Sequence, residues 1–160
     1  MLGNGYICQS GTYATHITGI PYTMDVTKND GTWSVGSSGS TDTSRVNWNT
    51  DGGVRLGKNQ TSSDIYITKT FHIPADISVK VTANGIHNGT GSLWKEDNTV
   101  TLTVGSTKVI EQTQSGNKEK AFSCSSANAS MSSSKNTVKL NSNYNLSGAK
   151  VVLKALTIQY

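Results

Sequence analysis

An antiparallel β-sandwich of about ten short strands is the fold that this sequence predicts. Apolar and polar residues alternate through the middle of the chain, turn signals recur about every 8–12 residues, and no stretch has the periodicity of a helix. The composition agrees with this class, because hydrophobic residues make up 34% and charged residues 15%. A chain with so few hydrophobic residues can still fill one core when its apolar side chains share one face of each strand.

The clearest predicted strand spans residues 64–73. Its apolar residues are spaced by two positions, with Lys69 as the exception: Ile65, Ile67, Phe71 and Ile73. The positions between them are polar: Tyr66, Thr68, Thr70 and His72. Because successive side chains point to opposite faces, this strand has a dry side and a wet side. Pro74 ends it, since proline cannot donate a hydrogen bond to a neighbouring strand.

Two further strands follow with the same alternation. The first covers residues 77–84, with apolar side chains at Ile77, Val79, Val81 and Ala83. A Gly- and Asn-rich loop comes next and includes residues 88–98. The alternation returns at residues 99–104, in Val100, Leu102 and Val104. These strands are expected to supply much of the core.

Shorter strands are expected before this region, at residues 22–26, 32–35, 45–48 and 54–57. Asn29-Asp30-Gly31 is expected to join the first two as a hairpin, because these residues favour a tight turn with positive φ. Residues 50–53 are expected to turn the second pair. The polar segment 36–44 is predicted to be a long loop.

The remaining strands are expected at residues 108–111, 121–124, 137–141 and 150–160. The Ser-, Asn- and Ala-rich segment 125–136 is predicted to be a loop with Met131 tucked in. The last strand changes phase partway, from Val151, Leu153 and Ala155 to Leu156, Ile158 and Tyr160. A β-bulge near Ala155 would produce this one-residue slip.

A chain of 160 residues suits one domain with one core. Residues 22–160 are expected to form this sandwich as a single domain. Residues 1–21 are rich in Gly, Thr and Tyr and are expected to be an extended N-terminal arm or the first edge strands. If the arm docks on a neighbouring subunit, the anchors are expected to be its larger side chains: Tyr6, Ile7, Tyr13 and Ile20.

The formal charge of +4 does not come from a basic run, because the lysines and arginines are dispersed along the chain. Nucleic acid is therefore not an expected partner. No apolar run approaches the roughly 18 residues of a membrane-spanning helix, so no membrane partner is expected either. The N-terminus lacks the charged and apolar regions of a signal peptide, so either the chain is not exported or a signal has been removed.

The two cysteines, Cys8 and Cys124, fit no metal-binding spacing. In an exported protein, a bridge between them would tie the N-terminal segment to the body and stabilise it by about 3–4 kcal/mol in the loop-entropy model. In a protein assembled in the cytoplasm, both would be reduced and would act as small hydrophobic residues. The missing export signal favours free thiols.

No catalytic site can be assembled from the sequence. The chain has no phosphate-binding loop, dinucleotide motif or nucleophile elbow, and most of its acidic residues fall in turns, where local hydrogen bonds explain them. His16, His72 and His87 are too dispersed to predict a metal site. Asp51 and Glu96-Asp97 could offer oxygen ligands to a structural calcium, but turn chemistry explains both. An enzyme, a cofactor and a bound metal are therefore not expected.

Tryptophan side chains are the best candidates for stacking on a sugar ring. Trp48 shares the phase of Val46 and is expected in the core, whereas Trp33 lies in the predicted hairpin. Trp94 lies in the loop 88–98 among Gly, Ser and charged residues. Trp94 and Trp33 are therefore the predicted ligand-binding residues. The partner of Trp94 would be a glycan, a neighbouring subunit or the domain's own loop.

The middle of the chain, residues 54–105, resembles the jelly-roll modules of Bacteroidetes surface proteins and of their phages. The resemblance rests on a Leu-Gly strand, a long strand ending in Ile-Pro, a Val-x-Val strand and a Thr-x-Thr-Val strand, at residues 54–57, 64–74, 77–85 and 99–105. It implies a jelly-roll-like sandwich. It also implies two kinds of function, because this group includes virion surface proteins and carbohydrate-binding modules.

Two functional hypotheses follow. The first is a non-enzymatic structural protein on the virion surface of a bacteriophage, a capsid-decorating or fibre-like protein that forms a homo-oligomer such as a trimer. The missing export signal, the polar β composition and the lack of a recognisable site favour it. The alternative is a carbohydrate-binding jelly-roll module of a bacterial surface or secreted protein, located outside the cell, with Trp94 and Trp33 as its platform.

Overall fold

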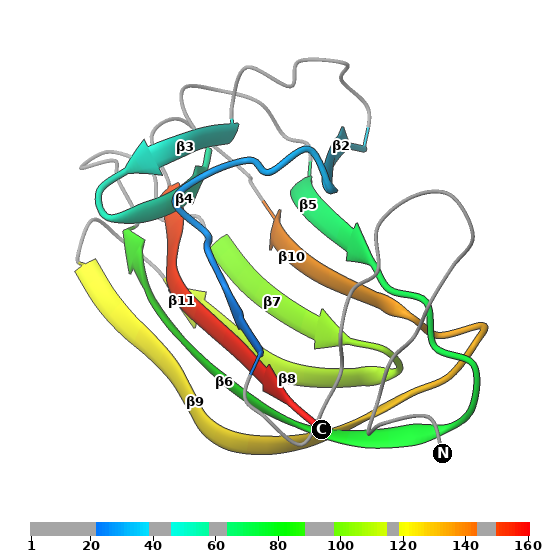
Figure 1. Ribbon diagram of the computed structural model, residues 1–160. Helices are drawn as coiled ribbons and strands as arrows, with labels where there is room; N and C mark the ends of the chain where they lie inside the picture. Colours follow the sequence, from blue (N-terminus) through cyan, green and yellow to red (C-terminus); the bar gives the residue numbers. More distant parts are fainter. Residues whose placement is uncertain (1–21, 39–45, 58–63, 89–97, 115–118, 144–149) are drawn as a thin grey trace.

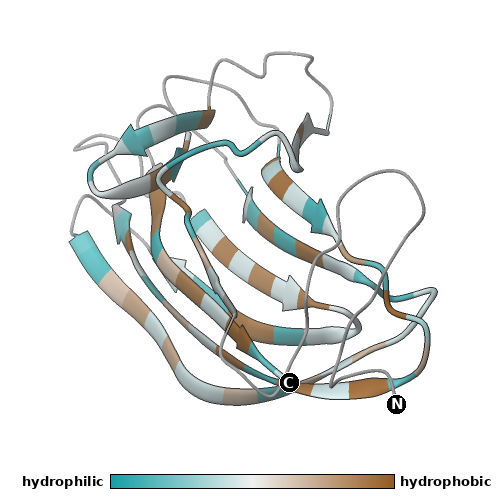
Figure 2. Cartoon of the chain, viewed as in Figure 1, coloured by the Kyte–Doolittle hydropathy of each residue, from teal (hydrophilic) through white to brown (hydrophobic). Residues whose placement is uncertain are grey.

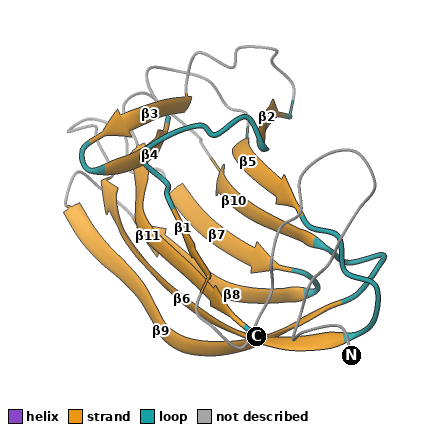
Figure 3. Ribbon diagram, in the orientation of Figure 1, coloured by secondary structure: helices purple, strands orange, loops and turns teal. Residues whose placement is uncertain are grey.

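The computed structural model describes residues 22–38, 46–57, 64–88, 98–114, 119–143 and 150–160. Within these ranges the chain forms eleven β-strands and no helix (Figures 1 and 3). The strands build two antiparallel sheets that pack face to face, so the prediction of an all-β antiparallel sandwich is confirmed. In this part of the chain no helix is long and apolar enough to cross a membrane.

The first sheet has six strands: β1 (Tyr22–Met24), β3 (Val46–Thr50), β4 (Gly53–Leu56), β6 (Ile77–Asn88), β9 (Glu119–Met131) and β11 (Lys150–Gln159). Their order is β3-β4-β11-β6-β9, and β1 pairs with the second half of β11 beyond the part that β4 uses. The second sheet has five strands: β2 (Trp33–Ser37), β5 (Ile65–Thr70), β7 (Asn98–Val104), β8 (Thr107–Gln114) and β10 (Thr137–Asn143). Their order is β2-β5-β10-β7-β8. Each sheet therefore joins distant parts of the chain, as in a jelly-roll-like sandwich.

The core lies between the sheets and comes from the alternation seen in the sequence. In β5, β6 and β7 the buried apolar residues are the expected ones: Ile65, Ile67, Val79, Val81, Ala83, Val100, Leu102 and Val104. Figure 2 shows hydrophobic bands alternating with polar bands along the strands of the second sheet. Burying this apolar surface contributes about 25 cal/mol per Å² and is the main force that holds the two sheets together.

Contacts between the sheets close both long edges of the sandwich. At one edge, Trp33 of β2 packs against Trp48 of β3, with ring centroids 6.1 Å apart. At the other edge, the Ser106 amide donates to the carbonyl oxygen of Ser130 at 3.2 Å. The Ser130 amide donates to the Thr107 hydroxyl at 3.3 Å. The edge strand β9 is thereby fixed to the turn that joins β7 and β8.

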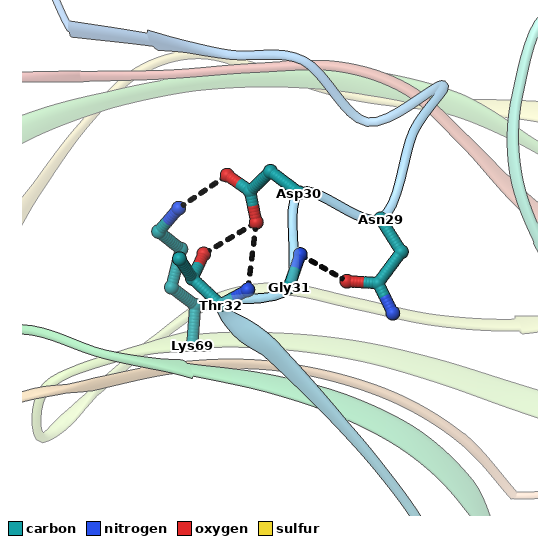
Figure 4. A network of polar contacts seen from close by, with 5 residues as sticks. All are labelled: Asn29, Asp30, Gly31, Thr32 and Lys69. Atoms are coloured by element: carbon teal, nitrogen blue, oxygen red, sulfur yellow. Dashed lines mark hydrogen bonds and ion pairs between the residues drawn. The ribbon is translucent and has the colours of Figure 1, made fainter. Parts of the chain in front are cut away.

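The predicted hairpin of residues 22–26 and 32–35 is wrong, because its two strands lie in different sheets. β1 pairs with β11 in the first sheet, and β2 pairs with β5 in the second. The turn itself follows the Asn29-Asp30-Gly31 signal: Gly31 has a φ of 82°, and its amide donates to the Asn29 side chain at 3.0 Å (Figure 4). Local turn chemistry determines the turn, whereas the pairing of the flanking strands depends on distant partners.

Two segments expected as loops continue as strands. β6 runs through Gly85 to Asn88, and β9 runs through its serine-rich part to Met131. A Cβ at Gly85 would collide with the ring of Phe122 and the carbonyl oxygen of Val152, so the glycine allows β6 to pack tightly against its neighbours. In β9, Ala129 and Met131 are buried, which compensates for the weak strand preference of the polar residues between them.

The predicted β-bulge near Ala155 is confirmed. The register between β11 and β6 shifts between Leu153 and Ala155. Leu153 and Leu156 are both buried, although three positions separate them. The bulge therefore keeps the apolar side of both halves of β11 turned towards the core.

Candidate functional site

A candidate site lies on the outer face of the first sheet, near the end where β6 begins and the chain ends (Figure 1). The strand register aligns Gln159, Lys80 and Asn128 across β11, β6 and β9. Ser78 and Ser130 form the next aligned pair on β6 and β9. All five residues are exposed, because they occupy the polar phase of strands whose other phase lies in the core. The sheet thus presents an ordered polar strip.

Two turns border this strip. β7 turns into β8 at Gly105, which has a φ of 59° and lies so close to the Ser130 carbonyl oxygen that a Cβ would collide with it. The turn between β9 and β10 is closed by two backbone hydrogen bonds between Ser132 and Lys135, of 3.1 and 3.2 Å. The Lys135 amide also donates to the Ser132 hydroxyl at 3.2 Å. These bonds fix the positions of the serines that line the turn.

The strip and the turns enclose an open cleft of about 560 Å³. Its lining is rich in hydroxyl groups and carries one acid and one base: Asp76, Ile77, Ser78, Ser106, Ser130, Met131, Ser132, Ser134 and Lys135. A smaller depression of about 220 Å³ has a different lining: Ser78, Val79, Lys80, Asn128, Gln159 and Tyr160. Ser78 belongs to both, so the two hollows adjoin. The larger one has the size of a small-molecule site, which is typically about 300–1,000 Å³.

Tyr160 borders the smaller depression, with 53% of its surface exposed. Among the described residues it is the only large hydrophobic side chain that is exposed. The predicted core phase of the last strand holds for Leu156 and Ile158, which are buried, and is wrong for Tyr160. The reason is that β11 ends at Gln159, so Tyr160 no longer follows the alternation.

The polar groups of the two hollows are available to a ligand. Within the described part of the chain, no hydrogen bond or ion pair engages these side chains: Asp76, Lys80, Asn128, Lys135 and Gln159. A side-chain amide both donates and accepts hydrogen bonds, and a serine hydroxyl does the same. The hollows can therefore recognise a ligand that is rich in hydroxyl groups.

A second polar cluster surrounds Lys69, and its groups are already engaged with one another (Figure 4). Lys69 Nζ lies 3.2 Å from Asp30 Oδ2 and 5.7 Å from the centroid of the Trp33 ring. Asp30 also accepts hydrogen bonds from the amide and the hydroxyl of Thr32, at 2.9 and 2.6 Å. Burial raises the pKa of the Asp30 carboxyl, but the hydrogen bonds from Thr32 and Lys69 outweigh it and hold this pKa below its usual value. This cluster stabilises the fold.

Tyr66 lies on the outer face of the second sheet, and its ring is also engaged. The ring rests on Gly36, where a Cβ would collide with it. Lys139 Nζ lies 4.0 Å from the ring centroid, which is a cation–π contact. Because these neighbours use the ring, Tyr66 offers less free surface for stacking than Tyr160 does.

Of the two predicted ligand-binding tryptophans, the structure describes Trp33. Trp94 lies outside the described residues. Trp33 is 6% exposed and packs against Trp48, so its role as a platform stays a prediction that this packing does not support. The predicted anchors of the N-terminal arm also lie outside the described residues: Tyr6, Ile7, Tyr13 and Ile20.

Cys124 is a buried free thiol, and its Sγ donates to the carbonyl oxygen of Val81 at 3.3 Å. The sequence favours free thiols over a bridge between Cys8 and Cys124, and Cys8 lies outside the described residues. The weighed calcium ligand Asp51 lies 3.7 Å from Arg55, and Glu96-Asp97 lies outside the described residues. In the described ranges, no group of three or more His, Cys, Asp or Glu side chains could hold a metal ion.

The cleft residues leave only a weak signal in the sequence. The exposure of Ser78 and Lys80 is predicted, because they fill the polar phase of a clear strand. Asn128 and Ser130 fall in the segment predicted as a loop, and Tyr160 falls in the predicted core phase. Only the pairing of β6 with both β9 and β11 brings these residues together, and no local pattern contains that pairing.

The fold is similar to those of solved structures that share little sequence identity with this chain. A cleaved adhesin domain of Lys-gingipain from Porphyromonas gingivalis aligns with a TM-score of 0.52 and 10% identity, over 88% of this chain and 98% of that one. The CBM36-1 domain of a multidomain xylanase from the hindgut metagenome of Trinervitermes trinervoides aligns with a TM-score of 0.41 and 13% identity, over 88% and 98% of the two chains. TmCBM61, solved in complex with β-1,4-galactotriose, aligns with a TM-score of 0.42 and 11% identity, over 79% and 86%. No family model and no curated protein matches the sequence.

The resemblance to surface-protein sandwich modules, predicted from residues 54–105, thus extends as a likeness of fold over most of the chain. The chain is an all-β sandwich of the kind found in a bacterial adhesin domain. This adhesin domain is not described as a virion protein. The prediction of a phage virion protein therefore gains no support from it.

Proposed function

We propose that this chain is a non-catalytic carbohydrate-binding module that acts outside the cell, on a bacterial surface or in a secreted protein. The observation that carries the proposal is the exposed ring of Tyr160 beside a depression lined by amide, hydroxyl and ammonium groups. The C–H groups of a sugar ring pack on an aromatic face, while the sugar hydroxyls exchange hydrogen bonds with amides and serines.

The rigidity of the site supports the same function. Lys80, Asn128 and Gln159 project from three paired strands, and Ser132 and Lys135 are held by the hydrogen bonds of their turn. The backbone at these positions is already ordered and loses little conformational freedom when a ligand binds. A shallow, open site can therefore still bind a sugar chain with useful affinity.

The absence of a paired acid supports a binding function over hydrolysis. Glycoside hydrolysis requires two carboxyl groups that are about 5–10 Å apart. Among the described residues, Asp76 is the one carboxylate side chain that lines either hollow. The likeness of fold to an adhesin domain agrees with attachment rather than turnover.

The experiment is affinity gel electrophoresis of the purified chain through gels that contain soluble polysaccharides, such as galactan, xylan, pectin and dextran. We expect at least one polysaccharide to retard the wild type, and we expect Tyr160→Ala to abolish the retardation. Tyr66→Ala is the matched control, because it removes a tyrosine from the outer face of the other sheet. Circular dichroism verifies that both variants fold. If no polysaccharide retards the wild type, or if Tyr160→Ala behaves like the wild type, the proposal is wrong.

A further inference from the structure

We infer that the polysaccharide recognised at this cleft carries anionic groups, carboxylate or sulfate, and this inference rests on the proposed carbohydrate-binding function. Two ammonium groups, those of Lys80 and Lys135, line the adjoining hollows. Neither takes part in an ion pair or a side-chain hydrogen bond within the described part of the chain. Both side chains are exposed and are free to meet a ligand.

Several other cations of the described chain already have carboxylate partners. The four pairs are Lys28 with Asp25, Arg55 with Asp51, Lys69 with Asp30 and Lys108 with Glu111, at 4.0, 3.7, 3.2 and 2.9 Å. These pairs use acids that lie away from the cleft. Lys80 and Lys135 form no such pair within the described part of the chain, and Asp76 is the one acidic side chain in the lining of the two hollows.

The neighbours of Lys80 suit an anion better than a neutral sugar alone. Gln159 and Asn128 flank Lys80 on the two adjacent strands, about 4.8 Å away on either side, as strand spacing requires. Each amide offers N–H donors in addition to the ammonium group. An anionic oxygen placed above Lys80 would accept charge-assisted hydrogen bonds, which are stronger than neutral ones.

Lys135 repeats this arrangement on the side of the larger cleft, where its neighbours are the hydroxyls of Ser132 and Ser134. The two hydroxyls lie 3.4 Å apart and share a hydrogen bond in which either can be the donor. This leaves one hydroxyl proton to donate to a ligand oxygen. Asp76 is the counter-charge of this hollow. The side chains that line the two hollows therefore sum to two lysines minus one aspartate, a formal side-chain charge of +1. An anionic chain with regularly spaced charges can meet both lysines while a neutral hydroxyl faces Asp76.

The test compares ligands that differ only in charge, using the full chain. Polygalacturonate is paired with its methyl-esterified form, and dextran sulfate is paired with dextran. We expect one anionic member to bind and its neutral counterpart to bind weakly or not at all. We also expect the association constant of the anionic member to fall as the salt concentration of the assay is raised from about 50 to about 500 mM, because salt screens the attraction between exposed charges. A difference in the polygalacturonate pair would identify carboxylate as the recognised group, and a difference in the dextran sulfate pair would identify sulfate.

The variants separate a site from general electrostatic attraction. Lys80→Ala with Lys135→Ala is expected to weaken binding about tenfold or more, since hydrogen bonds to charged groups are stronger than neutral ones. The control double variant, Lys108→Ala with Lys139→Ala, removes the same charge from the other sheet and is expected to stay within about twofold. Equal loss in both double variants overturns the inference.

The remaining outcomes distinguish the two proposals. If charged and neutral members bind equally, and Tyr160→Ala abolishes both, the inference of an anionic ligand is wrong and the carbohydrate-binding function stands. If neither these four ligands nor the polysaccharides of the gel panel bind, both proposals are wrong. Thermal unfolding curves verify that the lysine variants fold as the wild type does.

Discussion

Lys69 Nζ lies 3.2 Å from Asp30 Oδ2 although Lys69 occupies an inward position of β5 and is only 3% exposed. In the sequence Lys69 is the exception in an otherwise apolar series. A buried ammonium group requires a partner, because its desolvation is costly. The turn that precedes β2 supplies Asp30, and Thr32 orients the carboxylate (Figure 4). The ion pair thus couples this turn to the neighbouring strand.

Removal of Asp30 should therefore be more harmful than removal of Lys69. We expect Asp30→Ala to lower the free energy of unfolding by about 2–3 kcal/mol, less than for a fully buried pair because Asp30 is half exposed. Lys69→Met should lower it much less, and the double variant should recover most of the loss. Urea unfolding measures all three. Asp25→Ala is the control, because Asp25 makes similar contacts with Thr27 but its ion-pair partner, Lys28, is exposed, whereas Lys69 is buried. Equal losses in Asp30→Ala and Asp25→Ala would contradict the role of the ion pair.

His87 is the second polar side chain in the core phase, near the end of β6. It is completely buried, and in the described part of the chain neither of its ring nitrogens has a hydrogen-bond partner. Asn98 at the start of β7 is also buried and accepts a hydrogen bond from the Ser142 hydroxyl at 3.4 Å. Burial, and secondly the charge of Lys120, lower the pKa of His87 to about 4. The imidazole is therefore neutral at pH 7.

This pKa predicts a loss of stability in mild acid. Between pH 6.5 and about 4 the unfolded chain binds a proton at His87 that the folded chain does not. The free energy of unfolding is therefore unaffected by protonation of His87 above pH 6.5. It falls as the pH drops towards 4, by up to about 3 kcal/mol. Urea unfolding at pH 7 and pH 4.5 should show that His87→Leu reduces the difference between the two pH values. His72→Gln, at an exposed histidine, is the control. If the free energy of unfolding of His87→Leu depended on pH as strongly as that of the wild type, the prediction would be wrong.

Alternation along each strand predicted most of the core correctly, because each residue's face depends only on its position in the strand. The bulge in β11 was predictable for the same reason, since a phase slip at Ala155 is visible locally. The sheet to which each strand belongs was not predictable. A strong turn signal at Asn29-Asp30-Gly31 joined β1 and β2 in sequence, yet their partners, β11 and β5, lie far along the chain.

The candidate site was less predictable than the fold. Tryptophans stand out in a sequence, but Trp33 is used to close the edge of the sandwich. Tyr160 and Asn128 stand out much less, and their proximity follows from the pairing of three strands. A site assembled across strands depends on register, and register is a property of the whole sheet.

Two glycines should tolerate alanine to different extents, because they serve different physical needs. Gly85 allows close packing, since a Cβ would collide with Phe122 and the Val152 carbonyl oxygen. Gly52 has a φ of 81° and open space around it, so alanine there would meet only backbone strain of about 1 kcal/mol. We expect Gly85→Ala to lose at least about 2 kcal/mol. Thermal or urea unfolding compares the two, and a smaller loss for Gly85→Ala than for Gly52→Ala would contradict this account.

Trp33 and Tyr160 should show opposite effects on stability and binding. Trp33 is buried and packs against Trp48, and truncation of such a side chain typically costs about 3–5 kcal/mol. We expect Trp33→Leu to cost somewhat less, because leucine refills part of the space, and to leave polysaccharide retention intact at a temperature where the variant is folded. Tyr160→Ala should abolish retention with little change in unfolding free energy, because the ring is 53% exposed. Loss of retention in a folded Trp33→Leu variant would instead restore Trp33 as the sugar platform, and the cleft beside Tyr160 would lose its assigned role.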